Sequence, residues 1–151
     1  MKKLLQNDYL NLLVRLILSG VFIFFAIGKI ADPWLFAKEI NNYQIMPEFT
    51  ISFMALVLPW LELFCGFLIL AGIKVKSSAF ICSGLLVVFI IAIFIAMSKG
   101  LNINCGCSTQ TYQEVGWAKI FEDILLLIGF IYLFFFPNSK LNLIRVPELK
   151  M

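Results

Sequence analysis

The sequence predicts an all-α, polytopic membrane protein: a bundle of four transmembrane helices with a short amphipathic interfacial helix between the first and the second. The chain of 151 residues is 62% hydrophobic and only 14% charged, whereas a soluble domain is close to half apolar and a quarter charged. Its apolar residues gather into runs of about twenty, the length that crosses ~30 Å of hydrocarbon. The loops are too short for a second folded unit, so we expect residues 1–151 to form a single domain.

Short polar segments separate the four expected spans. The spans cover residues 10–31, 51–73, 79–97 and 117–137. A signal peptide is the alternative for the first run, but the run is too long and no small-x-small cleavage site closes it, so we expect a retained helix. After it, Asp32-Pro33 is a signal for an N-cap and a first helical turn. The segment from there to Pro47 is expected to form an amphipathic helix lying at the membrane surface. Its apolar residues are Trp34, Leu35, Ile40 and Tyr43, and its polar residues are Lys38, Glu39, Asn41 and Asn42.

The basic residues predict an orientation. The chain has 12 Lys and Arg, and eight of them lie in the N-terminal segment, the turn after the second span and the C-terminal tail: Lys2, Lys3, Arg15, Lys74, Lys76, Lys140, Arg145 and Lys150. The positive-inside rule places these segments in the cytoplasm and the loop before the fourth span outside, which is the periplasm of a Gram-negative cell. We therefore expect a multi-pass protein of the inner (plasma) membrane, with the lipid bilayer as its surroundings and both termini cytoplasmic.

Two further expectations follow from the charges. Arg15, at the cytoplasmic end of the first span, is expected to extend its side chain to the membrane surface. The net charge of +3 is small and lies mainly in tails and loops, so nucleic acid is not an expected partner.

The outer loop contains Cys105-Gly106-Cys107. Two sulfurs with one residue between them can close a small ring, and Gly106 permits the backbone turn that this needs. A small strained disulfide is easily reduced, which indicates an exchange-competent pair and not a structural bond. Two unpaired thiols are the alternative. A zinc site is not expected, because two ligands are missing and the chain has no His.

The other two cysteines, Cys65 and Cys82, lie in adjacent antiparallel spans, where they could face each other at similar depth. One interpretation is that each is a small buried apolar residue. The other is a second redox pair that relays electrons inward. Both interpretations stay open at this point.

Ionisable residues at membrane depth are costly and indicate function. Glu62 is the deepest, while Lys29, Glu122 and Asp123 lie in the outer third of their spans. A buried acid–lysine cluster beneath the dithiol could relay the protons that are released when two thiols become a disulfide, or it could be a structural polar contact between helices. Trp60, close to Glu62, could line a cavity for an aromatic ring such as a quinone, with simple packing as the alternative.

Several short elements between Arg15 and about Phe136 form one pattern. They are Gly28-Lys29, Asp32-Pro33, Tyr43, Pro47, the Pro59–Gly66 segment and Asn104-Cys105-Gly106-Cys107. In this pattern the chain resembles the MauE/DoxX-like family of redox-associated membrane proteins, and its MauE (methylamine utilisation) branch more than DoxX proper. The resemblance implies a four-helix membrane bundle, a thioredoxin-like periplasmic partner and disulfide formation in client proteins. It implies Cys105 and Cys107 as the exchange pair, and Lys29 and Glu62 as the polar centre.

Two features depart from the family pattern. Relatives often follow the Cys-Gly-Cys motif with an aromatic residue and a glycine, where this chain has Ser108-Thr109. Many also have an arginine early in the fourth span, where Glu122-Asp123 stands here. The departures put the partner protein and the charge partner of Glu62 in question.

Two classes of function are therefore expected. The leading hypothesis is a membrane thiol–disulfide redox protein, of the oxidoreductase type, whose outward-facing Cys105/Cys107 pair exchanges disulfides with a thioredoxin-like periplasmic partner and passes electrons toward quinone. The alternative is a non-catalytic membrane anchor or assembly subunit of a redox complex. A small transporter is less well supported, because paired broken helices and repeats are missing from the sequence. The client protein, the electron acceptor, the first-attacking cysteine and a homo-oligomeric state stay open.

Overall fold

The computed structural model describes residues 8–100 and 116–136, and its regular structure there consists of helices, without strands. The helices are α2 (Asp8–Ala31), α3 (Pro33–Asn42), α4 (Glu48–Ala71), α5 (Val75–Ser98) and α6 (Trp117–Phe135). Three of them, α2, α4 and α5, are long and apolar enough to cross a membrane. The predicted all-α class is therefore confirmed.

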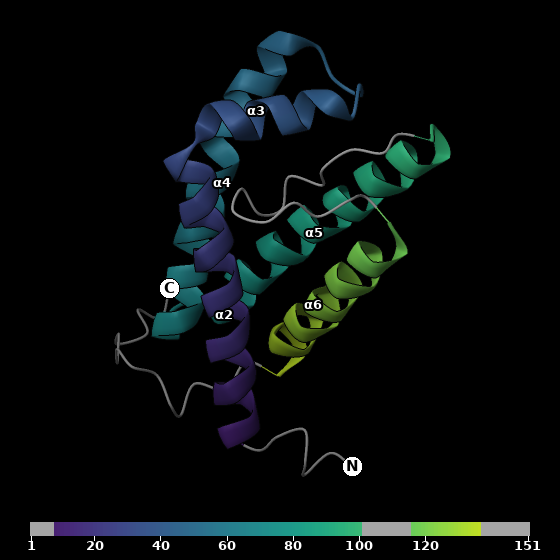
Figure 1. The fold of residues 1–151 in the computed structure, drawn as a ribbon. Helices are drawn as coiled ribbons and strands as arrows, with labels where there is room; N and C mark the ends of the chain where they lie inside the picture. Colours follow the sequence, from purple (N-terminus) through teal and green to yellow (C-terminus); the bar gives the residue numbers. More distant parts are fainter. Residues whose placement is uncertain (1–7, 101–115, 137–151) are drawn as a thin grey trace.

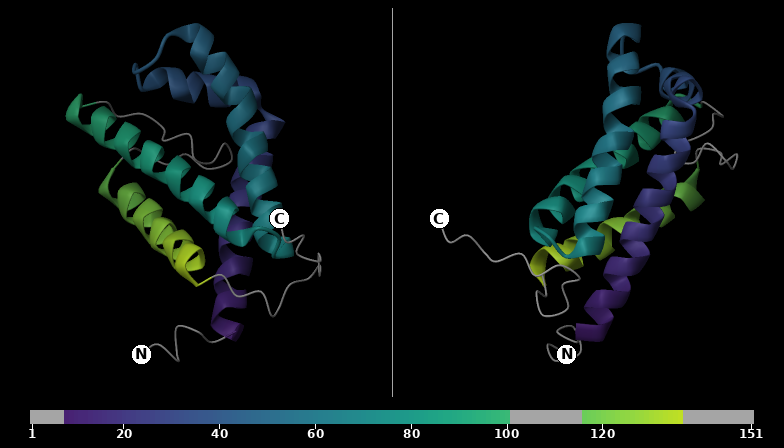
Figure 2. Two further views of the ribbon diagram at one scale, coloured as in Figure 1. Left: turned by 180° about the vertical axis from the view of Figure 1, so that it is seen from behind. Right: turned by 90° about the vertical axis from the view of Figure 1, so that its left-hand side faces the viewer.

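The four long helices form two antiparallel pairs. Helix α2 packs along α4, and α5 packs along α6 (Figure 1). Both views of Figure 2 show the two pairs inclined to each other, with α3 lying across one end of the α2–α4 pair. The pairs meet near their middle, where the rings of Phe22 and Phe130 pack edge to face with centroids 4.7 Å apart.

The predicted start of the short helix is confirmed at the level of individual hydrogen bonds. The Asp32 carboxylate accepts a hydrogen bond of 2.9 Å from the Leu35 backbone N–H, and Pro33 occupies the first turn. This is how an N-cap residue satisfies a helix-terminal N–H that lacks a partner within the helix. The helix buries Phe36 and Glu39 against the bundle and exposes Trp34. Glu39 was expected on the polar face, and the prediction was wrong because the face toward α4 includes this position.

The turn between α4 and α5 is shorter than the sequence suggested. Gly72 has φ 81° and ends α4, with the Ile73 N–H bonded to the Leu68 carbonyl at 2.9 Å. This left-handed glycine ending is a common way to stop a helix and turn the chain. Helix α5 then begins at Val75, so residues 76–78 are helical and not part of a polar turn. The two helices are therefore held at a fixed register by three residues.

Candidate functional site

A buried ion pair joins α2 and α4 inside the helix bundle. Lys29 Nζ lies 2.8 Å from both carboxylate oxygens of Glu62. Their side chains are only 3% and 6% exposed. Lys29 Nζ also lies 5.0 Å from the ring centroids of Phe36 and of Phe89. A cation near an aromatic ring is attracted by the electron-rich face of the ring quadrupole, so the ammonium has favourable contacts on several sides.

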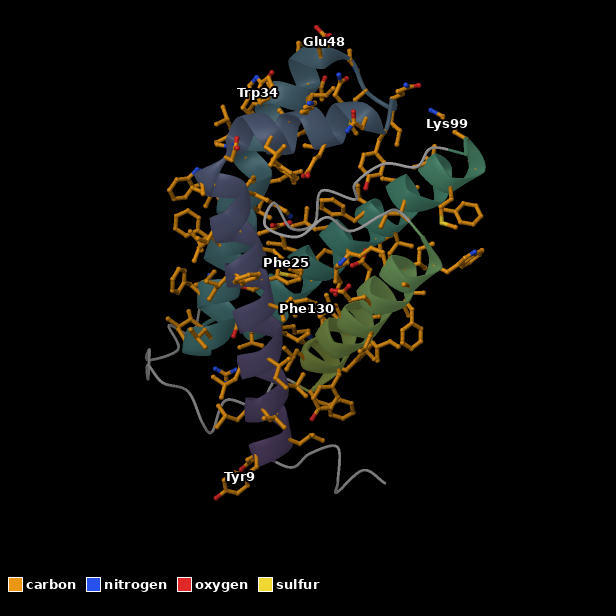
Figure 3. The ribbon with its side chains drawn as sticks, in the orientation of Figure 1. Tyr9, Phe25, Trp34, Glu48, Lys99 and Phe130 are labelled. Carbon is orange, nitrogen blue, oxygen red and sulfur yellow. The ribbon has the colours of Figure 1, made fainter. Side chains whose placement is uncertain are left out.

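A second charged group lies on α6. Lys119 Nζ is 3.1 Å from Glu122 Oε2 and 3.4 Å from Asp123 Oδ1. Lys119 and Asp123 are buried, whereas Glu122 is at the edge of the group. The ammonium of Lys119 is 5.4 Å from the ring centroid of Phe25, which Figure 3 shows near the centre of the bundle. The ring of Phe25 on α2 thus links the two helix pairs at this level.

The two charged groups meet at a small cavity between the helix pairs. Lys29, Glu62 and Asp123 line it together with five apolar residues: Phe22, Phe25, Leu86, Phe89 and Leu126. The space open to water centres is about 30 Å³, which is enough for one or two water molecules. The Oδ2 atom of Asp123 is buried with no hydrogen-bond partner within residues 8–100 and 116–136. It is therefore a lining atom with free capacity to accept a hydrogen bond or a proton.

Sequence reasoning named Lys29 and Glu62 as a polar centre, and the structure brings them into direct contact. Asp123 was named in a wider acid–lysine cluster but not as a site residue. The sequence signal was present, because Lys119 and Asp123 stand four positions apart and so face the same side of a helix. Which side faces Lys29 is decided by the packing of α6 on α5.

The expected exchange pair, Cys105 and Cys107, lies outside the described residues. The segment that carries it follows α5 and precedes α6. Lys119 and Asp123 lie in the first two turns of α6, which places them 12 and 16 residues after Cys107 in the sequence.

The other two cysteines face each other across α4 and α5. The thiols of Cys65 and Cys82 are near enough to interact with each other, and both cysteines are free and buried. The expected facing geometry is therefore confirmed, although it does not by itself assign a role.

Trp60 lies on the outer surface of α4 and not in the charged cavity. It is 50% exposed, and its ring centroid is 6.3 Å from that of Phe64. The two rings and Leu56, Val57, Leu61 and Cys65 line a shallow groove. All these lining groups are apolar or weakly polar, and the expected binding of an aromatic ring at Trp60 stays a prediction.

Arg15 has a role that the sequence did not indicate. It is 1% exposed, and it donates hydrogen bonds from Nε to the Ile69 carbonyl at 3.1 Å and from Nη2 to the Leu70 carbonyl at 3.2 Å. The expected extension of its side chain to the membrane surface is therefore wrong. The last carbonyls of α4 have no partner within the helix and carry negative charge, and a guanidinium satisfies both.

Metal binding is not indicated within the described parts of the chain, since residues 8–100 and 116–136 contain no cluster of three or more Cys, Asp or Glu side chains able to hold an ion.

Comparison with known proteins covers most of this architecture. The profile of the family described as methylamine utilisation protein MauE matches residues 7–136. The chain belongs to the MauE family. It is 28% identical over 121 residues to the methylamine utilization protein MauE of Methylophilus methylotrophus, covering 78% of this chain and 62% of that protein. It is 34% identical over 119 residues to MauE of Methylorubrum extorquens, covering 78% and 64%.

A relative with a different name covers more of the chain. Protein TlpB of Flavobacterium psychrophilum is 24% identical over 150 residues, which is 91% of this chain but 40% of that protein. The chain thus spans between two fifths and just under two thirds of the length of these relatives. No solved structure matches the chain. The family assignment and the three helices that are long and apolar enough to cross a membrane together identify a multi-pass membrane protein.

Proposed function

We propose that this MauE-family protein is a membrane thiol–disulfide redox protein whose outward-facing Cys105/Cys107 pair exchanges disulfides with a thioredoxin-like periplasmic partner. The observation that carries the proposal is the Cys-Gly-Cys sequence between α5 and α6 in a chain of this family. In one exchange the Cys105–Cys107 disulfide is reduced to two thiols, while two thiols of the partner become a disulfide. The electron pair then passes from Cys105 and Cys107 to a quinone in the bilayer.

The charged cavity supports the proposal because reoxidation of a dithiol releases two protons. Asp123 stands 16 residues after Cys107 in the sequence, within the first two turns of α6, and it offers an oxygen with free acceptor capacity. Proton transfer is efficient when an acceptor is held within hydrogen-bond reach of the donor or of one bridging water. We propose that Asp123 and the Lys29–Glu62 pair receive these protons.

The proposed topology has four spans, with α3 at the outer membrane surface and both termini in the cytoplasm of a cell with an inner membrane. Helix α6 has 19 residues, or about 28 Å at 1.5 Å per residue, which nearly matches the hydrocarbon thickness of ~30 Å. Its three charged side chains are paired with one another, which lowers the cost of burying them. Figure 3 is consistent with an outer and a cytoplasmic end of the bundle. Trp34, Glu48 and Lys99 lie at one end of the molecule, and Tyr9 lies at the other.

A non-catalytic anchor is the second candidate, and one observation favours it. Lys29 donates to both oxygens of Glu62, and a pair with this geometry is sufficient to hold α2 against α4 without any proton transfer. Under this second proposal Cys105 and Cys107 would contribute to partner binding, and no electrons would pass through them.

A thiol titration of the purified full-length protein in mild detergent tests the proposal. The protein is equilibrated in buffers with graded ratios of reduced to oxidised dithiothreitol. Free thiols are then alkylated with a mass tag and assigned by peptide mapping. Cys105 and Cys107 are expected to titrate together as a two-electron couple. The ratio of disulfide to dithiol should then change tenfold for each ~30 mV of buffer potential. Thiols that stay reduced at every ratio, or a disulfide that is never reduced, would contradict exchange.

The double variant Cys105→Ser/Cys107→Ser separates the two candidates. A redox protein loses the ability to oxidise a reduced thioredoxin-type probe, whereas an anchor retains its binding to the same probe. Lys38→Met, which removes an exposed charge on α3, serves as the matched control and is expected to leave both properties unchanged.

A further inference from the structure

The pair formed by Cys65 and Cys82 is not used in the exchange proposed above, and it is built from described residues alone. Cys65 is 4% exposed and Cys82 is 0% exposed. They come from different helices, and their thiols are near enough to interact with each other. Both lie in the apolar core cluster that also contains Phe22, Ile69 and Phe130.

The short turn between α4 and α5 keeps the two sulfurs close. Three residues join the helices, so their ends cannot slide apart, and the thiol pair lies at the same depth on both helices. A disulfide requires two sulfurs on facing β-carbons at short range. Two thiols that already interact in a fixed register need little movement to form a disulfide.

A base lies one helical turn away. Glu62 precedes Cys65 by three positions on α4, which places both side chains on the same face of the helix. The carboxylate is close enough to act electrostatically on both thiols. A thiol must lose its proton before its sulfur can react, and we take the Glu62 carboxylate, one helical turn away, as the proton acceptor.

Access to the pair comes from the lipid side. Cys82 has no exposed surface, while Cys65 borders the apolar groove that contains Trp60 and Phe64. A water-soluble disulfide or peroxide would have to enter hydrocarbon to reach Cys65. Quinones dissolve in hydrocarbon and accept two electrons and two protons, which is what two thiols release on forming a disulfide.

We propose that Cys65 and Cys82 are a second, intramembrane dithiol that is oxidised to a disulfide between α4 and α5 by a lipid-soluble quinone reaching Cys65 through this groove. Two S–H bonds break and one S–S bond forms. The electron pair and two protons leave the thiols, and the quinone becomes a hydroquinone. Glu62 takes up the first proton and passes it on. This inference does not rest on exchange at Cys105 and Cys107.

The test uses the full chain carrying Cys105→Ser and Cys107→Ser, so that Cys65 and Cys82 are the remaining thiols of the four cysteines. The protein in lipid nanodiscs is incubated with decylubiquinone or with oxidised glutathione, then denatured and alkylated with a mass tag. We expect decylubiquinone to remove both titratable thiols, with one hydroquinone formed per protein and recovery by dithiothreitol. Oxidised glutathione should remove neither.

Additional variants test the bond and the groove separately. A further Cys82→Ser change leaves one thiol, which should stay titratable because it cannot form an intramolecular disulfide. Trp60→Ala should slow the loss of thiols several-fold with decylubiquinone and not with copper phenanthroline, whereas Phe94→Ala, which removes an exposed ring on α5, should change neither rate.

Thiols that stay fully titratable after decylubiquinone treatment would overturn the proposal. This holds even if copper phenanthroline closes the bond, because the pair would then be oxidisable but not by a quinone. If oxidised glutathione removed the titratable thiols as well as decylubiquinone does, the proposal that the oxidant reaches Cys65 from the lipid side would be overturned. Because the loop cysteines are absent from this variant, none of these outcomes depends on the proposed exchange function.

Discussion

Lys29 and Glu62 are almost entirely removed from solvent, so each needs the other. The carboxylate is held by two contacts of 2.8 Å from one ammonium, and the ammonium is flanked by two phenylalanine rings. Moving either charge alone out of water costs several kcal/mol, while the intact pair recovers most of that cost. The proposed role of the pair in proton transfer depends on the same balance, because a change of charge on one partner alters the energy of the other.

Changing either partner of this pair is therefore expected to be costly. Lys29→Met or Glu62→Gln should each lower the free energy of unfolding by about 3–5 kcal/mol, because an uncompensated charge stays buried. The double variant should recover part of the loss. The measurement is unfolding of the purified protein from mixed micelles, followed by circular dichroism.

Lys38→Met is the matched control for the loss of a lysine, since Lys38 is exposed on α3, and it should stay within about 0.5 kcal/mol of the unchanged protein. Single variants as stable as this control, or losses that simply add in the double variant, would show that Lys29 and Glu62 do not depend on each other.

At the scale of helices, the contact between α2 and α4 depends on the small size of Gly66. A β-carbon added at Gly66 would lie 2.9 Å from Ile23 Cγ1. It would also meet the backbone of α2 at ordinary contact distance, 3.6 Å from the Ser19 carbonyl oxygen. Small residues that let two backbones approach are the usual means of helix association in membranes, where apolar burial gives no advantage over lipid.

Gly66→Ala is expected to destabilise the α2–α4 pair by about 1–3 kcal/mol, because the β-branched Ile23 has little rotamer freedom with which to move aside. Gly84→Ala is the matched control on α5, where an added β-carbon meets nothing within 4 Å. It should leave stability unchanged or raise it, since alanine favours a helix more than glycine does. Unfolding curves of the two variants that coincide would refute the close contact.

At the scale of the whole molecule, two helix pairs meet around the charged cavity. One pair brings Lys29 and Glu62, and the other brings Lys119 and Asp123. The α3 end is tied to α5 by a hydrogen bond of 3.1 Å from Lys99 Nζ to the Gln44 carbonyl. The cavity therefore depends on both pairs, and the proposed four-span topology places it between the outer surface and the Cys65/Cys82 pair.

Labelling of single engineered cysteines tests this topology. Asn41 on α3 and Ser77 near the start of α5 are both exposed, and each can be changed to Cys in the chain that lacks Cys105 and Cys107. A membrane-impermeant maleimide should label Asn41→Cys in intact cells and should label Ser77→Cys only after the membrane is opened. The reverse pattern would contradict the proposed orientation.

Residue order alone determined the broad architecture, because long apolar runs have few ways to satisfy their backbone in lipid other than as helices. It also determined the start of α3, since Asp32 caps the helix through atoms three residues away in the chain. The Cys-Gly-Cys motif and the family could likewise be read from the sequence, as both are local patterns.

The tertiary structure alone decided which charges meet. Lys29 and Glu62 are 33 residues apart, and Arg15 reaches carbonyls 54 and 55 residues away. Such contacts depend on the rotation of each helix about its axis, and nearly uniform apolar helices carry little sequence signal for that rotation. Close packing between helices fixes this rotation, as at Gly66 between α2 and α4. The same packing brings Asp123 to the cavity and sets Cys65 against Cys82.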